Sequence, residues 1–233
     1  MAHSPRVGPR GVQVLVIAKE PVAGRVKTRL TPPFTPQEAA MLAEAALADT
    51  LHAVCSAGAV RRVLALAGQP GSWLPDGFDV IGQRGAGLDE RIAWALADAR
   101  VTLPLPVVLI GMDTPQVTPS ELDDLLSLLV SSPATREGRP AVLGPASDGG
   151  WWVIGLPGAD PRRVFCGVEM STPYTGDAQL RRLRALGLAV SVVQEHRDID
   201  TFADLAAVGE AHPHLRTAAA WGRWSTPAVA MAK

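Results

Sequence analysis

The sequence has few cysteines, no excess of basic charge and no long apolar run, and each shortage excludes a class of protein. Two cysteines in 233 residues, without CxxC spacing, give neither a disulfide framework nor a zinc site. The formal net charge of −1 argues against non-specific nucleic-acid binding, which needs an extended basic face. No run approaches the roughly 20 apolar residues of a membrane span. We therefore expect a cytoplasmic protein without a nucleic-acid or membrane partner.

Three well-known sequence signatures are also missing. No GxGxxG follows the first apolar run, no GxxxxGK[ST] occurs, and no GxSxG occurs. These absences disfavour a dinucleotide-binding fold, a P-loop NTPase and an α/β-hydrolase. The composition, 47% hydrophobic and 19% charged, fits a globular chain rather than a disordered one.

Apolar runs alternate with amphipathic segments along the chain. Capping boxes at Thr35 with Glu38 and at Thr118 with Glu121 each open a helix. Strands are expected at 12–18, 60–67, 78–81, 106–111, 141–144, 151–156 and 188–193, and residues 157–175 are expected to be irregular. The alternation predicts an α/β fold: a single three-layer αβα domain with a mostly parallel, mixed sheet of about seven strands.

The expected domain spans residues 12–212, between a loose N-terminus at 1–11 and a C-terminal tail at 213–233. The apolar run near the N-terminus is too short for a signal peptide. The tail lacks periodicity and is expected to be peripheral to catalysis. Trp221 and Trp224 could pack on the domain or on a second subunit, so a homodimer stays open.

A loop dense in positive charge follows the first apolar run. It holds four cations within eleven residues: Lys19, Arg25, Lys27 and Arg29. Pro21 and Gly24 prevent a continuous helix there. Exposed like charges this close repel one another unless an anion lies among them, and phosphate oxygens pair with both Arg and Lys. A solvated basic loop on an ordinary α/β domain is an equally good interpretation of the loop alone.

Three aspartates follow strands at the edge where ligands bind to parallel sheets. Asp113 comes directly after an aliphatic run, and Asp198 and Asp200 point the same way on an extended segment. Their oxygens and substrate phosphates together could hold Mg²⁺. Alternatively, Asp113 begins a turn and Asp200 belongs to a helix cap.

Two further segments can approach a ligand closely. Asp148, Gly149 and Gly150 form a loop between strands, which could equally be a plain hairpin connection. The segment 82–91 could wrap a base or a sugar, or be an ordinary strand-to-helix loop. His196 could touch substrate, although a lone histidine is more often structural.

Four motifs occur in the order typical of one group of enzymes: AKEPVAGRVKTRL, GMDTP, GPASDGGWWVIGL and DIDTFADL. Over about residues 12–210 the chain resembles a family of GT-A-type transferases, described as glycosyltransferase-like and found beside radical-SAM and selenodomain proteins. It is also similar to the guanylyltransferases that activate phospholactate or phosphoenolpyruvate in cofactor F420 synthesis.

The resemblance implies a role for each candidate residue. Lys19, Arg25, Lys27 and Arg29, in the loop with Gly24, would grip nucleotide phosphates. Asp113 would be the central metal ligand, with Asp198 and Asp200 completing the set. Gly82, Gln83 and Leu88 fall where relatives line the base pocket, and Asp148, Gly149 and Gly150 fall near the acceptor. Met170, where relatives often carry Trp, and the GAGLDER segment leave acceptor and base open.

The resulting hypothesis is nucleotidyl transfer that depends on Mg²⁺ or Mn²⁺. A small phosphorylated or carboxylate acceptor would attack the α-phosphorus of a nucleoside triphosphate, GTP by resemblance, and release pyrophosphate. The catalytic residues would be Lys19, Arg25, Lys27 and Asp113. The alternative is a glycosyltransferase that uses a nucleotide-diphospho-sugar. A third interpretation, a non-catalytic nucleotide-binding module, fits a complete site less well.

Overall fold

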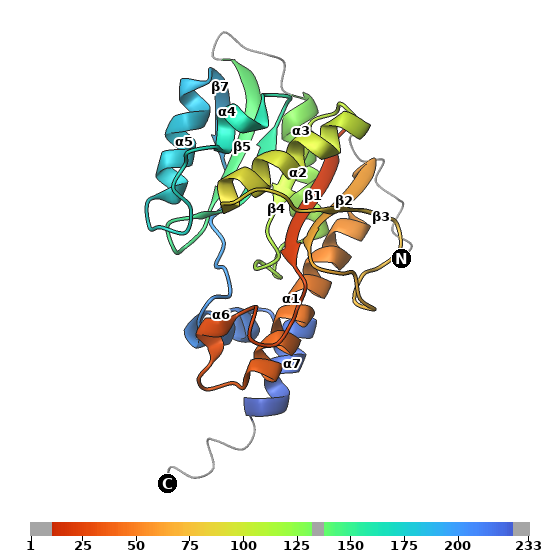
Figure 1. Ribbon diagram of the computed structural model, residues 1–233, viewed down its shortest axis with the longest axis vertical. Coiled ribbons are helices and arrows are strands. Elements are labelled where there is room, and N and C mark those ends of the chain that lie inside the picture. Colours follow the sequence, from red (N-terminus) through yellow and green to blue (C-terminus); the bar gives the residue numbers. More distant parts are fainter. Residues whose placement is uncertain (1–10, 132–137, 226–233) are drawn as a thin grey trace.

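The computed structural model describes residues 11–131 and 138–225 (Figure 1). Within these ranges one seven-stranded sheet has the order β3-β2-β1-β4-β6-β5-β7. Its strands are β1 (Gln13–Lys19), β2 (Arg61–Ala67), β3 (Phe78–Gly82), β4 (Val107–Ile110), β5 (Arg139–Pro145), β6 (Trp151–Leu156) and β7 (Leu188–Val192). Only β6 runs antiparallel to its neighbours β4 and β5 in this sheet. The predicted mixed, mostly parallel sheet is therefore confirmed, and the other strands all end at one edge.

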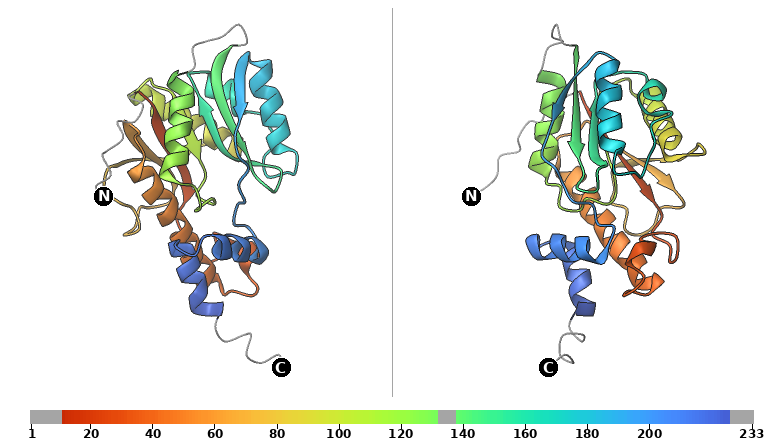
Figure 2. Two further views of the ribbon diagram at one scale, coloured as in Figure 1. Left: turned by 180° about the vertical axis from the view of Figure 1, so that it is seen from behind. Right: turned by 90° about the vertical axis from the view of Figure 1, so that its left-hand side faces the viewer.

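Helices cover both faces of the sheet (Figure 2). On one face lie α1 (Pro36–Ser56) and α3 (Pro119–Ser131), whose apolar side chains form a core with Val14 and Val16 of β1. On the other lie α2 (Leu88–Thr102), α4 (Pro161–Phe165) and α5 (Thr175–Ala185), which form a core with Leu15. Because successive strand residues face opposite layers, β1 is apolar from Val14 to Ala18, and the buried Gln13 at its start is the exception. The predicted three-layer domain is confirmed.

A third, smaller core lies below the sheet in Figure 1, at the end where the strands finish. It is built by the 3₁₀ turn η1 (Thr28–Leu30), the start of α1, α6 (Phe202–Ala211) and α7 (Arg216–Ser225). Its buried members include Leu30, Phe34 and Ile199, with Trp221 and Trp224 packed against them. These two tryptophans, whose partner the sequence left open, therefore pack on their own chain.

The helix starts that the sequence predicted are present. Thr35 and Glu38 form a complete capping box at α1. Thr118 and Glu121 form the same reciprocal bonds at α3. Both motifs depend only on residues three apart, so sequence suffices to find them.

The expectation that residues 157–175 are irregular is wrong in part, because α4 forms there. The carboxylate of Asp160 accepts a hydrogen bond from the Arg162 N–H, and Pro161 occupies the first turn. A capping residue followed by proline is itself a helix-start signal. The N-terminus at 1–10 and the tail end at 226–233 lie outside the described residues. Within the described ranges, no helix combines the length and apolar character needed to cross a bilayer.

Candidate functional site

A cleft of about 520 Å³ opens at the edge where the parallel strands end. Eleven of the predicted site residues line it: Lys19, Arg25, Lys27, Arg29, Gln83, Leu88, Asp113, Asp148, Gly150, Asp198 and Asp200. The predicted glycines Gly24, Gly82 and Gly149 are not part of its lining. Side chains that are up to 181 residues apart in the chain, from Lys19 to Asp200, thus meet at one sheet edge.

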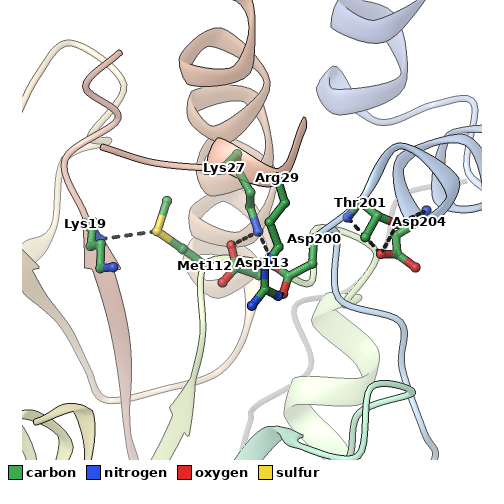
Figure 3. Close-up of polar contacts among 8 residues, drawn as sticks. All are labelled: Lys19, Lys27, Arg29, Met112, Asp113, Asp200, Thr201 and Asp204. Atoms are coloured by element: carbon green, nitrogen blue, oxygen red, sulfur yellow. Dashed lines mark hydrogen bonds and ion pairs between the residues drawn. The ribbon is translucent and has the colours of Figure 1, made fainter. Parts of the chain in front are cut away.

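The basic loop is held by two buried apolar side chains. Val26 packs into the core beneath α1, and Leu30 is fully buried in the small core. At the end of β1, the Lys19 N–H donates a hydrogen bond to the Met112 Sδ at 3.2 Å (Figure 3). Lys27 adopts a left-handed conformation with φ of 47°, and its carbonyl accepts from the Leu30 N–H. These anchors fix where the charged side chains between them enter the cleft.

Lys27 lies between two aspartates (Figure 3). Its ammonium forms ion pairs with Asp113 and, at 3.2 Å, with Asp200, and its side chain is only 7% exposed. Arg29 donates to the other oxygen of Asp200 at 3.1 Å. Burial alone would lower the pKa of Lys27, but the charges and hydrogen bonds of Asp113 and Asp200 outweigh burial and raise it. Lys27 is therefore a charged internal counter-ion.

Lys19 and Arg25 differ from the other two cations of the loop. Both side chains are exposed and line the cleft. Across the described part of the chain neither forms an ion pair, whereas Lys27 and Arg29 do. Among the four cations of the loop, the positive charge that is free to meet an anionic ligand is thus that of Lys19 and Arg25.

Asp198 is a partly buried carboxylate with too little positive charge around it. Its Oδ1 atom is buried and has no hydrogen-bond partner among the described residues. Burial, and then the charges of Asp113 and Asp148, raise the pKa of Asp198 to about 7, and the charge of Lys27 only partly offsets them. A bound cation would relieve this repulsion. Oxygen donors of this kind suit Mg²⁺ or Mn²⁺.

The described residues contain no group of three His, Cys, Asp or Glu side chains placed to hold a metal together. Mg²⁺ usually takes only one or two carboxylates and completes its shell with substrate phosphates and water. The residues therefore fit a cation that Asp113 and Asp198 hold together with a ligand. Asp200, which the sequence also predicted as a ligand, contacts Lys27 and Arg29 instead, and its role at a metal stays a prediction.

The loop that carries Asp148 joins β5 to the antiparallel β6, so it is a hairpin connection as well as part of the cleft. The Asp148 Oδ1 accepts from the Gly150 N–H at 2.8 Å. Gly149 has φ of 88°, and a Cβ atom there would collide with the Pro173 carbonyl. Its own carbonyl accepts from the Gly176 N–H at 2.8 Å. Gly149 is therefore not part of the cleft lining itself, but it joins the loop that carries Asp148 to the start of α5.

Gln83, predicted to line a base pocket, also has a structural task. Its side-chain N–H₂ donates to the Ala18 carbonyl at 2.7 Å and to the Ala65 carbonyl at 2.9 Å. It thereby joins the ends of β1 and β2 beside the cleft. These two bonds fix the amide group of Gln83 in place. A side chain that lines a binding site must be held in this way.

Further lining residues were not predicted as site residues: Arg91, Trp151, Met170, Ser171, Thr172 and Thr175. Arg91 was not named singly, but it lies at the end of the segment 82–91, which the sequence analysis expected to wrap a base or a sugar. Of the others, Trp151 begins β6, Thr175 begins α5, and the remaining three come from the loop before α5. Nothing local in the sequence brings these segments to the cleft, so only the tertiary structure reveals them.

The sheet order, the layers and the position of the cleft define a GT-A-like fold of the nucleotide-diphospho-sugar transferase type. The chain belongs to the family described as "Uncharacterized protein conserved in bacteria (DUF2064)", whose model matches residues 41–172. No curated protein sequence matches the chain.

Solved structures agree on the fold. A protein from Desulfovibrio desulfuricans G20, named as a proposed nucleotide-diphospho-sugar transferase, is 25% identical with a TM-score of 0.80, over 91% of this chain and 94% of that one. CMP:2-keto-3-deoxy-manno-octonic acid synthetase, complexed with CTP, is 12% identical with a TM-score of 0.54, over 88% and 99%. A cytidylyltransferase from Leptospira borgpetersenii is 14% identical with a TM-score of 0.53, over 88% and 87%. The last two similarities concern the fold alone.

Proposed function

We propose that this protein is a transferase with a nucleotide donor, and that it transfers a nucleotidyl group from a nucleoside triphosphate to a small acceptor. The observation that carries the proposal is the meeting of two unpaired cations, Lys19 and Arg25, with the aspartates Asp113 and Asp198 in one cleft. The fold shared with nucleotide-using transferases supports it.

Charge balance favours a triphosphate donor. One divalent cation offsets the charge of a diphosphate sugar, but it leaves net negative charge on a triphosphate. Lys27 and Arg29 are already paired with aspartates, so they add little. Lys19 and Arg25 remain to meet the residual charge of the triphosphate.

In the proposed reaction an acceptor oxygen bonds to the α-phosphorus while the bond to pyrophosphate breaks. A phosphate or carboxylate acceptor is already ionised at neutral pH, so no proton has to be removed. Lys19 and Arg25 would pair with the phosphate oxygens and stabilise the charge that grows on pyrophosphate. Asp113 and Asp198 would hold the divalent cation, which, when bound, polarises the phosphate oxygens. Lys27 forms an ion pair with Asp113 and holds it in place.

The finer assignments rest on the resemblance in the four sequence motifs. On that basis we propose Mg²⁺ as the cation, GTP as the donor, and an acceptor related to phospholactate or phosphoenolpyruvate. A role beside radical-SAM and selenodomain proteins belongs to the same proposal.

A second candidate is glycosyl transfer from a nucleotide-diphospho-sugar. It is favoured by the name of the Desulfovibrio protein, which shares 25% identity across most of both chains. Both candidates use the same fold and a metal, so the aspartates do not distinguish them. The distinction lies in the donor and in the leaving group.

Thermal denaturation of the full chain with Mg²⁺ and a nucleotide panel tests the proposal. The panel holds ATP, GTP, CTP, UTP and the UDP- and GDP-sugars. A ligand at 100 times its Kd stabilises by about 2.7 kcal/mol, a shift of several degrees in Tm for a chain of this size. We expect a triphosphate to give the largest shift.

Two variants sharpen this test. Lys19→Gln should reduce the triphosphate shift, whereas Arg163→Gln, which alters an exposed residue of α4 outside the cleft, should leave it unchanged. A larger shift with a nucleotide sugar, and transfer that releases the diphosphate, would replace the proposal with glycosyl transfer. No shift with any nucleotide would refute both.

A further inference from the structure

The segment at 194–200, which we name the strap, connects β7 to α6 (Figure 1). It contains Asp198 and Asp200, both of which line the cleft. The strap is neither helix nor strand. Without regular structure, its position depends on individual contacts.

Backbone hydrogen bonds hold the strap at two points along the edge of the sheet. The His196 N–H donates to the Pro145 carbonyl at 3.1 Å, and the His196 carbonyl accepts from the Ser147 N–H at 2.9 Å. Further on, the Ile199 N–H donates to the Asp113 carbonyl at 3.0 Å. The strap thus passes from the end of β5 to Asp113, three residues beyond the end of β4, and it carries Asp198 between these two points.

Two buried side chains outside the strap bind its carbonyls. The Trp152 indole N–H donates to the Gln194 carbonyl at 2.9 Å. The Gln116 amide donates to the Arg197 carbonyl at 2.8 Å. The exposed fractions of Trp152 and Gln116 are only 3% and 7%. Rigid, buried donors of this kind fix a loop better than surface contacts do.

His196 adds a side-chain anchor between these points. Its Nε2 lies 3.0 Å from the Glu121 Oε1, and its ring centroid lies 4.4 Å from that of Trp152. The His196 side chain is only 10% exposed. The hydrogen bond to His196, followed by those from Thr118, lowers the pKa of Glu121 to about 2, despite the opposing effect of its partial burial. An ionised carboxylate only accepts, so Nε2 carries the proton and donates.

Glu121 divides its two oxygens between two elements. Oε2 accepts from the N–H and the hydroxyl of Thr118 and caps α3, while Oε1 accepts from His196. The start of α3 and the strap are therefore tied to a single carboxylate.

We propose that His196 and Glu121 are positioning residues, which hold the strap so that Asp198 can bind a divalent cation together with a nucleotide. The inference rests on the proposed function and deepens it. Neither the His196 nor the Glu121 side chain is part of the cleft lining, so both would act on the cation only through the strap. Groups that orient a metal-binding side chain from behind typically change metal affinity 10–100-fold when they are removed.

The test uses the full chain with His196→Ala and His196→Gln. Gln keeps an N–H donor at a similar reach, whereas Ala removes it. We measure Mn²⁺ binding alone and with each of ATP, GTP, CTP and UTP, and we follow amide hydrogen exchange at Ile199. In the Ala variant we expect roughly 10-fold weaker Mn²⁺ binding and faster exchange. In the Gln variant, the Mn²⁺ affinity and the exchange rate at Ile199 should both return towards the wild-type values.

Arg197→Gln is the matched control. Arg197 lies on the same strap, but its guanidinium pairs with Asp204 on α6 and is 48% exposed. It should change neither readout. If His196→Ala fails to fold, Glu121→Gln is the second variant. Gln also serves in a capping box, and with its oxygen on Thr118 it presents an N–H₂ group to His196 in place of the accepting carboxylate oxygen. The same direction of change is expected.

If amide hydrogen exchange at Ile199 were unchanged in a folded His196→Ala variant, His196 would not hold the strap. That result would overturn the inference regardless of which ligand the protein binds. Faster exchange with unchanged Mn²⁺ affinity would also overturn it, because the strap would then not matter for the cation. If the wild-type chain bound no Mn²⁺ with any nucleotide, the proposed function would fail, and the cation role of the strap would fail with it.

Discussion

At the scale of single residues, Lys27 has the most consequential contacts in the cleft. It is the only cleft-lining cation of the described chain whose side chain is buried against two aspartates. Its ammonium keeps Asp113 and Asp200 at fixed positions before any ligand arrives. Arg29 contacts Asp200 too, but with a guanidinium side chain that is 71% exposed.

Lys27→Gln should lower the free energy of unfolding by about 1–3 kcal/mol, because it leaves two carboxylates without their shared charged partner. Arg29→Gln is the control and should cost at most about 1 kcal/mol, as exposed ion pairs do. Urea denaturation of both variants measures the difference. Equal effects would show that the buried position of Lys27 does not matter.

Glu121 predicts a dependence of stability on pH. Its folded-state pKa, about 2, lies below the ordinary value of 4.5. The ionised form is therefore stabilised in the fold, and its contribution is complete above about pH 4.5 and lost as the pH falls towards 2. In Glu121→Gln this contribution is absent at every pH. The difference in stability between wild type and variant should shrink from pH 6 to pH 3, as measured by urea denaturation; a constant difference would contradict the assignment.

At the scale of elements, one wall of the cleft depends on two segments that approach each other closely. The β5–β6 hairpin loop touches the start of α5 at Gly149 and Gly176. A Cβ atom on Gly176 would collide with the Gly150 carbonyl. At Gly149 and at Gly176 an added Cβ would meet backbone atoms, which cannot move aside as a flexible side chain can. Both positions therefore require glycine.

A comparison of Gly149→Ala with Gly167→Ala separates the cost of a steric clash from the cost of left-handed backbone in a non-glycine residue. Both glycines have positive φ, 88° and 79°, but only at Gly149 would a Cβ meet another atom within 4 Å. Left-handed backbone costs a non-glycine residue roughly 1–2 kcal/mol, which both variants share. We expect Gly149→Ala to lose clearly more stability in urea denaturation. A similar loss in both would mean that the wall yields easily.

At the scale of the whole molecule, the small core links the parts of the site. Leu30 ends the basic loop, Ile199 lies between the two strap aspartates, and both are buried in this core. Helix α7 covers them and is itself held by α1. The Asp49 carboxylate of α1, which is 6% exposed, accepts from the N–H groups of Arg216 and Thr217 at 3.1 and 2.9 Å.

Removing the α7 contact should therefore affect more than the C-terminus. Asp49→Ala should lower the free energy of unfolding by about 1–3 kcal/mol, because the first N–H groups of α7 lose a buried acceptor. Glu44→Ala, which alters an exposed acid of the same helix, should stay within about 0.5 kcal/mol of wild type. Chemical denaturation measures both. Equal stability of the two variants would contradict the capping role of Asp49.

Deletion of residues 217–233 tests the link between this core and the site. The sequence alone suggested a peripheral tail, but the deletion would remove Trp221 and Trp224, which pack against the small core that contains Leu30 and Ile199. We expect the deletion to weaken binding of the preferred nucleotide more than a few-fold, as measured by titration calorimetry. Affinity within a few-fold of wild type, in a folded protein, would restore the first expectation.

The amino-acid sequence by itself determined the elements and the chemistry of this protein. Hydrophobic periodicity and capping boxes are local, so the alternation of strands and helices, and with it the layered fold, could be predicted. The residue types identified cations and carboxylates suited to phosphate and Mg²⁺. Two of the helices that the structure describes were overlooked: the short α4, despite the local signal at Asp160 and Pro161, and α7, which forms within the predicted tail.

The tertiary structure decided how these groups are used. Lys27 meets Asp200 across 173 residues of sequence, and that contact divides the four cations of the loop into paired and free ones. No spacing in the chain records such a pair, because it depends on the order of strands in the sheet and on how the strap crosses their ends. The same holds for His196 with Glu121, 75 residues apart, and for the cover that α7 gives the small core. Contacts between distant segments are fixed by packing, and packing is a property of the whole fold.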